Sequence, residues 1–277
     1  MNNVEWRQRE FNCLFPRRVA SLSGSRHSRW LSTVHYLVGI STRCWFWLMW
    51  IKICGITNPD DAAAVVDAGA NAIGLNFYQN SRRYVQPGQA RLIAKQVAGD
   101  TDIVGVFVNN PPDQVIQLTR DVGLTAVQFH GDETSSNIQH FQYLCPEIPV
   151  IRAFRIGSGT ASFETQWQEY AGLPTPLTAA LVDAWSSDEY GGTGQMLNAG
   201  LLDGHQRLVS QLILAGGLKP DNVAQAVSMV RPWGVDTASG VECAPGIKSA
   251  DLVGRFVTAC RVACPDESIV RISLRQN

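Results

Sequence analysis

The sequence predicts a single α/β domain folded as a (β/α)8 barrel, the TIM-barrel architecture, and three observations lead to this prediction. From residue 51 onward, short β-branched or apolar runs alternate with amphipathic stretches of helical period. Eight such strand–helix units fit into about 210 residues, and eight is the number of units that closes a barrel. The turn after the first predicted strand, CGITNPDD, lacks the GxGxxG pattern of doubly wound open sheets.

The predicted strands and helices follow one another without a linker or a second core. We expect strands at 51–55, 72–78, 102–108, 126–131, 149–156, 179–184, 210–217 and 232–240. We expect helices at 58–70, 87–98, 110–123, 133–144, 162–171, 195–203, 219–230 and 249–263. Asn58 and Pro59 illustrate how these helices start, because asparagine is a good N-cap and proline suits the first helical position.

The first fifty residues do not share this pattern. They contain seven arginines, no lysine, two acidic residues and five of the eight tryptophans. An arginine-rich, acid-poor leader is typical of an organelle transit peptide, whereas the run CWFWLMWI suits a membrane interface but is too short to span a bilayer. We favour a third interpretation, a start codon assigned too early, with translation beginning at Met49. The expected organisation is therefore a non-native or disordered extension over 1–48, the barrel over 49–264 and a tail over 265–277.

The composition narrows the class of function. A formal net charge of -1 argues against a nucleic-acid binder, and nothing in the folded part suggests a membrane protein. Seven cysteines without a CxxC pair or a zinc spacing indicate free thiols in a reducing compartment. We expect a cytoplasmic protein, organelle-targeted if the extension is a genuine leader. We expect no metal and no cofactor, and a monomer or homodimer that binds a small molecule.

The ends of the last two strands carry the most specific pattern. Barrel active sites form at the carboxyl ends of the strands, and the loops after strands seven and eight commonly bind phosphate through backbone N–H groups. Gly216, Gly217 and Gly240 would let the backbone approach an oxyanion, and Ser239 adds a hydroxyl donor. The alternative is that the glycines only end a strand and start a helix. Their occurrence in both loops favours a phosphorylated small substrate.

Cys54 and Asp183 end the first and sixth predicted strands. The alternative for Cys54 is a buried small hydrophobic residue, and for Asp183 a helix cap or a structural ion pair. Neither alternative is excluded by the sequence. Their shared position at the rim of the barrel favours a pair that moves protons.

Several motifs occur in the order seen in the phosphoribosylanthranilate isomerase family of tryptophan biosynthesis. They are KICGIT, SRRYV, GVFVN, VQFHGDE, LVDA, GGTG, LAGGLKPDNV and GVDTASGVECAPGIK, and together they cover about 51–262. The chain resembles this family, whose fold is the (β/α)8 barrel. The resemblance implies an Amadori rearrangement of N-(5′-phosphoribosyl)anthranilate to 1-(2-carboxyphenylamino)-1-deoxyribulose 5-phosphate. It places the general base at Cys54 and the general acid at Asp183.

These two roles require particular protonation states. A free thiol has a pKa near ~8.5, so Cys54 needs either a lowered pKa or deprotonation on demand to act as a base near pH 7. An aspartic acid has a pKa near ~3.9, so Asp183 needs a raised pKa to donate a proton.

The resemblance also suggests substrate-binding residues. It makes Arg83 the clamp for the anthranilate carboxylate, because a guanidinium matches a carboxylate bidentately. Arg82 is a rival, since it replaces the proline of the family's S-P-R pattern. Asp236 either contacts substrate hydroxyls or orients a loop. His130 and Gly192 are possible rim residues.

Two departures and two rival functions are part of the prediction. Ala238 removes one hydroxyl from the family's DVSSG pattern, and QMLNAG replaces an aromatic and acidic run after GGTG.

A related sugar isomerase of histidine biosynthesis uses aspartates at the ends of strands one and five, where this chain has Cys54 and Arg155. The alternative from another class of function is a non-catalytic or divergent phosphate-binding barrel. Such a barrel could also be a membrane-associated one, tethered by residues 44–51.

Overall fold

The computed structural model describes residues 49–156, 160–183, 202, 208–263 and 274. The predicted extension over 1–48, Gly192, the QMLNAG run, the helix expected at 195–203 except Leu202, and the tail over 265–277 except Leu274 lie outside the described residues. Contacts divide the chain into Met1–Cys44 and Trp45–Asn277, and every described residue belongs to the second unit. In that described part, no helix has the length and apolarity needed to cross a membrane.

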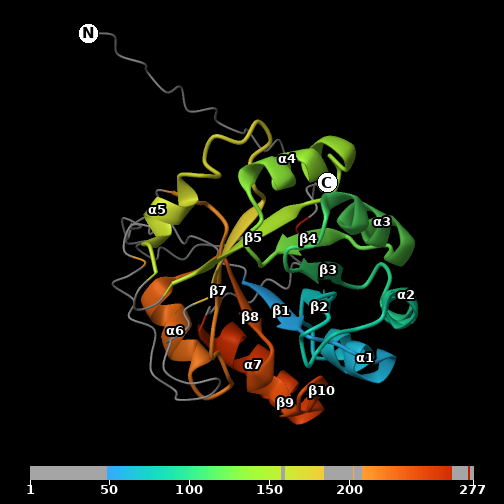
Figure 1. The fold of residues 1–277 in the computed structure, drawn as a ribbon. Coiled ribbons are helices and arrows are strands. Elements are labelled where there is room, and N and C mark those ends of the chain that lie inside the picture. Colours follow the sequence, from blue (N-terminus) through green and yellow to red (C-terminus); the bar gives the residue numbers. More distant parts are fainter. Residues whose placement is uncertain (1–48, 157–159, 184–201, 203–207, 264–273, 275–277) are drawn as a thin grey trace, which may run out of the picture. The chain divides into compact units, whose positions relative to one another are not determined.

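Eight parallel strands close into a barrel, each paired with its neighbours in chain order, with β8 returning to β1 (Figure 1). The strands are β1 (Trp50–Cys54), β2 (Ala72–Asn76), β3 (Asp102–Phe107), β4 (Ala126–Phe129), β5 (Val150–Arg155), β6 (Ala179–Asp183), β7 (Leu212–Ala215) and β8 (Gly234–Thr237). This arrangement confirms the predicted (β/α)8 class, and it brings the carboxyl ends of all eight strands to one rim.

Helices surround the barrel (Figure 1). They are α1 (Pro59–Asp67), α2 (Pro87–Gln96), α3 (Pro112–Val122), α4 (Ser135–Leu144), α5 (Phe163–Trp167), α6 (Val223–Val230) and α7 (Ala250–Ala263). The first starts as predicted, because the Asn58 side chain accepts a hydrogen bond of 2.8 Å from the backbone N–H of Asp61. The fifth helix, α5, ends at Trp167, before the predicted end at residue 171. Beyond it the chain passes into turns, in which the Tyr170 backbone N–H donates to the Trp167 carbonyl (2.9 Å) and the buried Tyr170 hydroxyl donates to the Glu133 carbonyl (2.8 Å).

The last two strands are shorter than predicted, because the phosphate-loop candidates turn the chain. β7 stops at Ala215, where Gly216 and Gly217 take φ values of 91° and 63° that few other residues adopt. β8 stops at Thr237, and a single 3₁₀ turn, η3 (Ser239–Val241), follows. A small hairpin of β9 (Glu242–Ala244) and β10 (Ile247–Lys248), absent from the prediction, precedes α7.

The core has two layers, because successive side chains of a strand point to opposite faces. The outward-facing residues, such as Ile51 and Ile53, pack against the helices in one large apolar cluster. Trp50 belongs to the inner cluster, which also contains Leu274. The Leu274 backbone N–H donates to Asp102 Oδ2 (3.0 Å), so this residue of the predicted tail contacts the barrel. The alternation places the side chains two and four residues after Trp50 inside the barrel as well.

Candidate active site

Cys54 stands at the carboxyl end of β1, on the inward face shared with Trp50 and Lys52. It pairs in register with Gly74 of β2, and a methyl group on Gly74 would lie only 2.8 Å from the Cys54 Sγ. The residue is partly exposed. Gly55, which follows with φ 77°, has no room for a side chain because the Arg83 stem packs against it. Glycine therefore follows the cysteine for a steric reason.

Lys52 lies one layer below Cys54 and is fully buried. Its Nζ donates to Asp236 Oδ2 at 2.9 Å, across the register pair that joins β1 to β8. The other carboxylate oxygen, Asp236 Oδ1, is buried and accepts no hydrogen bond from the described residues. Asp236 was predicted to contact substrate hydroxyls or to orient a loop, whereas Lys52 was not predicted. A lysine at an inward position of an otherwise apolar strand was the available signal.

Burial and neighbouring charges together set the pKa values of these groups. Burial raises the pKa of the Cys54 thiol above its ordinary value, although the positive charges of Lys52 and Lys248 oppose the rise. It also raises the pKa of Asp236, against the attraction of Lys52. Burial would lower the pKa of Lys52, but the charges of Asp236 and Cys54 outweigh it, so this pKa is raised and the lysine is charged at neutral pH. The direction of the Cys54 shift favours deprotonation on demand over a lowered pKa for this thiol.

Asp183 ends β6 on the same rim, with its side chain 27% exposed. Among the described residues, its ion-pair partner within 4 Å is His130, whose Nε2 lies 3.7 Å from Asp183 Oδ2. The other ring nitrogen, Nδ1, lies 2.8 Å from the Gln128 side-chain amide. The charges of Asp183 and His130 both act on the pKa of Asp236, and the charge of Asp236 acts on that of Cys54. The predicted catalytic pair and the predicted rim histidine therefore share one electrostatic neighbourhood.

Buried polar contacts hold the loop that carries His130. Glu133 accepts hydrogen bonds from the backbone N–H groups of Asn109 (2.7 Å) and Gly131 (2.9 Å). Arg152, on the outward face of β5 beside Tyr170, donates to the carbonyls of Phe129 (3.1 Å) and Gly131 (3.0 Å). These contacts restrict where the imidazole can lie relative to Asp183. They depend on residues far apart in sequence, so no local pattern predicted them.

The two predicted phosphate loops meet. The Thr237 hydroxyl donates to the Leu218 carbonyl at 2.6 Å, and a side chain on Gly240 would collide with that same carbonyl oxygen. Within the described part of the chain, the backbone N–H groups of Gly217 and Gly240 donate to no protein acceptor. Ser239 opens the 3₁₀ turn and is exposed. Free N–H groups beside an exposed hydroxyl at the start of a helical turn suit an oxyanion.

Arg83 lies at the same rim, in a cluster that the sequence analysis predicted only in part. Its Nε and Nη2 donate to the two carboxylate oxygens of Glu242 at 2.8 and 2.7 Å. Lys248 donates to Glu242 Oε1 at 2.7 Å. Paired with these cations, Glu242 has a pKa below its ordinary value, even though burial opposes the shift. Arg82, the rival, is exposed.

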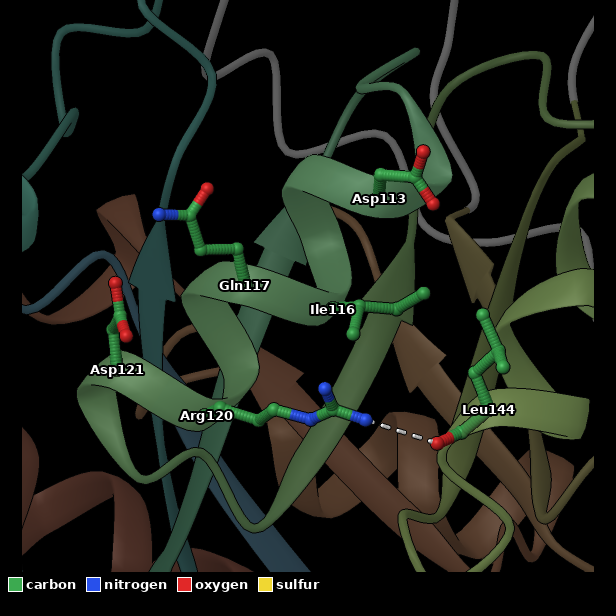
Figure 2. Close-up of a pocket in the computed structure, with 6 residues that line it drawn as sticks. All are labelled: Asp113, Ile116, Gln117, Arg120, Asp121 and Leu144. Carbon is green, nitrogen blue, oxygen red and sulfur yellow. Dashed lines mark hydrogen bonds between the residues drawn. The ribbon is translucent and has the colours of Figure 1, made fainter.

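A shallow pocket on the outside of the barrel contrasts with this rim (Figure 2). Its lining comes from α3 and the end of α4, namely Asp113, Ile116, Gln117, Arg120, Asp121 and Leu144. The Arg120 guanidinium donates to the Leu144 carbonyl at 3.3 Å. The lining contains none of the predicted site residues and lies on helices rather than at strand ends, so we assign it no part in the chemistry.

Comparisons with known proteins show what the whole chain is similar to. The sequence model of the N-(5′-phosphoribosyl)anthranilate isomerase family matches residues 51–259. The isomerase of Trichlorobacter lovleyi is 40% identical over 213 residues, which cover 77% of this chain and 98% of that protein. The isomerase of Bordetella parapertussis is 42% identical over 219 residues, covering 76% and 95%. The solved isomerase of Thermotoga maritima superimposes with a TM-score of 0.68 at 35% identity, over 78% of this chain and all of that one.

Proposed function

We propose, starting from the fact that the chain belongs to the N-(5′-phosphoribosyl)anthranilate isomerase family, that it isomerises N-(5′-phosphoribosyl)anthranilate in tryptophan biosynthesis. One observation carries the assignment of roles. Cys54 and Asp183 each end a strand at an inward-facing position, and both interact electrostatically with the same buried carboxylate, Asp236. A thiol and a carboxyl group thus lie on the rim that also carries the glycine loops.

Asp183 is the general acid in this proposal. The first step opens the furanose ring: a proton from the Asp183 carboxyl group goes to the ring oxygen as the C1′–O bond breaks. The electron pair of that bond stays on the oxygen, and a Schiff base forms between C1′ and the anthranilate nitrogen. The partial exposure of Asp183 and its contact with His130 allow the carboxylate to be reprotonated between turnovers.

Cys54 is the general base. Its thiolate removes the C2′ proton and becomes a neutral thiol. The C–H electron pair forms the C1′=C2′ bond of an enolamine, and the π pair of the C1′=N bond moves onto the anthranilate nitrogen. Protonation at C1′ and loss of the proton from the C2′ hydroxyl complete the ketose. Because burial raises the pKa of Cys54, only a minority of the thiol is ionised near pH 7. The rate is therefore expected to rise with pH until the thiol is fully ionised.

The charged ends of the substrate have distinct partners in this proposal. The phosphate is bound by the N–H groups of Gly217 and Gly240 and by the Ser239 hydroxyl. The anthranilate carboxylate is bound by Arg83, whose Nη1 has no acceptor among the described residues. Glu242 fixes the opposite edge of the guanidinium, so the binding edge is held in place before substrate arrives.

The decay of anthranilate fluorescence with freshly prepared substrate tests this function in the full chain. Cys54→Ala and Asp183→Asn are each expected to lower kcat by about 10²- to 10⁴-fold, the usual contribution of a positioned acid or base. Both variants should still bind the reduced product analogue found in a solved family member. Cys243→Ala, which removes an exposed thiol on β9, is the matched control and should retain activity.

Different results point to different failures. Near-normal kcat in either site variant would refute the role of that residue. A wild-type chain that binds the analogue but does not consume substrate would instead favour a non-catalytic phosphate-binding barrel.

The assembly state is a separate prediction, either a monomer or a homodimer. A solved Thermotoga maritima relative is described as dimeric, which supports the homodimer. Sedimentation velocity of the full chain distinguishes the two states by mass.

A further inference from the structure

Lys52 has no part in the proposed proton transfers, yet it occupies the centre of the barrel with no exposed surface. Lysine is almost never fully buried unless it is paired, because moving an ammonium group out of water is costly. Asp236 supplies that pairing at 2.9 Å. A buried ion pair of this kind is weak evidence for stability, since apolar residues of similar volume often serve as well or better. Its position directly below Cys54 suggests a purpose other than stability.

The missing side chain of Gly74 shows how close the ammonium stem is to the thiol. A methyl group there would lie 2.8 Å from the Cys54 Sγ and 3.1 Å from the Lys52 Cε. Cys54 Sγ and Lys52 Cε, the carbon that carries the ammonium group, are therefore less than about 6 Å apart, and the Lys52 charge acts on the pKa of Cys54. Glycine at this position leaves the space between sulfur and lysine unblocked.

We propose that Lys52 is a positioning residue whose buried ammonium group stabilises the thiolate form of Cys54, while Asp236 holds that ammonium in place through one carboxylate oxygen. The proposal rests on the proposed role of Cys54 as the base. Lys52 keeps its proton throughout and touches no reacting atom of the substrate. The proton that moves is the C2′ proton, which passes to the sulfur.

Every charged group that faces Cys54 enters this balance. Lys52 lowers the pKa of the thiol through its charge and a hydrogen bond, and Lys248, from the hairpin, lowers it to a smaller extent. Asp236 raises it. Arg83 also interacts with the thiolate, which raises the pKa of the guanidinium. Burial outweighs the attraction of these cations, so Lys52 reduces, but does not cancel, the cost of ionising the thiol.

The pH dependence of alkylation tests the proposal without measuring activity. The full chain is treated with iodoacetamide over a range of pH, and modification of Cys54 is followed by peptide mass spectrometry, with exposed Cys243 as the internal reference. Lys52→Met is expected to raise the apparent pKa of Cys54 by about 1 to 3 units. Asp236→Asn alone is expected to lower it, because the two charges act in opposite directions. Lys95→Met, on the exposed face of α2, should leave it unchanged.

A second comparison keeps the test decisive if Lys52→Met does not fold. Lys52→Met combined with Asp236→Asn removes both charges and leaves no unpaired ion. Its Cys54 pKa should exceed that of Asp236→Asn alone by about one unit or more. Equal values in these two variants would overturn the proposal, as would a lower Cys54 pKa in Lys52→Met.

Kinetics then separates this proposal from the function on which it rests. In Lys52→Met, the pH profile of kcat/KM should move to higher pH by the same amount as the alkylation profile, while KM for substrate changes little. A shifted alkylation profile together with an active Cys54→Ala variant would refute the role of Cys54 as base but not the Lys52–Cys54 coupling. An unshifted alkylation profile together with an inactive Cys54→Ala variant would refute only the coupling.

Discussion

A methyl group added at Gly74 tests whether the position of the Cys54 sulfur limits the rate. In Gly74→Ala, the new carbon would lie 2.8 Å from Cys54 Sγ and 3.0 Å from Cys54 Cα. Ordinary contact begins near 3.4 Å, and the Cα cannot rotate away because it belongs to the backbone of β1. The sulfur or the strand must therefore move by roughly 0.6 Å, about half of the 1 Å misplacement that can cost 10²-fold in rate.

We expect Gly74→Ala to lower kcat by roughly 10- to 100-fold, with little change in KM, since the phosphate and carboxylate partners lie elsewhere. Overpacking should also lower the free energy of unfolding by about 1–3 kcal/mol. The fluorescence assay gives kcat, and urea denaturation confirms that the variant is folded under assay conditions. A wild-type kcat in folded Gly74→Ala would refute the reasoning, because the thiol would then tolerate displacement.

Gly254→Ala is the matched control. Gly254 lies within α7, and a methyl group there meets no atom within 4 Å. Alanine is a better helix former than glycine, so this variant should gain about 0.5–1 kcal/mol of stability and keep its activity. A loss of activity in Gly254→Ala would mean that the assay responds to glycine replacement in general rather than to the thiol.

Three further predictions concern charged residues at the rim and directly below it. Arg83→Ala should raise KM about tenfold or more with a smaller change in kcat, whereas Arg82→Ala should leave both near wild type; equal effects on KM would remove the assignment of the clamp. Glu242 has a folded pKa below its ordinary value of 4.5, so it contributes stability above that pH and this contribution is lost as the pH falls through the folded pKa. In urea titrations at acid pH, the free energy of unfolding should therefore decline less steeply with falling pH in Glu242→Gln than in the wild type. Parallel declines would contradict this. Lys52→Met should cost about 3–5 kcal/mol by leaving the Asp236 carboxylate unpaired, and adding Asp236→Asn should recover most of that loss; equal stability of the single and double variants would contradict the pairing.

Local patterns were sufficient for the architecture of the barrel. Alternating apolar runs and helix starts such as Asn58–Pro59 act over a few residues, so the sequence displays them directly. The helix expected at 162–171 was too long because the backbone passes into hydrogen-bonded turns after Trp167, which no local pattern of the sequence marked. The hairpin that carries Glu242 was missed because its strands have only two or three residues and lack a clear period.

The site shows the same division between local and distant information. Cys54, Asp183 and the glycine loops were predicted because the ends of barrel strands are recognisable in sequence. The ion pair of Lys52 with Asp236 joins residues 184 positions apart, and only the closure of β8 on β1 brings them together. The direction of the pKa shift of Cys54 was likewise beyond sequence reasoning, because it depends on the balance between burial and several charges.

A crystal structure of the full chain with the reduced product analogue would test the central claim most directly. We expect the phosphate of the analogue on the N–H groups of Gly217 and Gly240. The Cys54 Sγ and a carboxylate oxygen of Asp183 should lie on opposite sides of the ribulose chain, each within about 3.5 Å of the atoms near C1′ and C2′. An analogue whose phosphate binds elsewhere, or a sulfur out of contact with the C2′ region, would contradict the account.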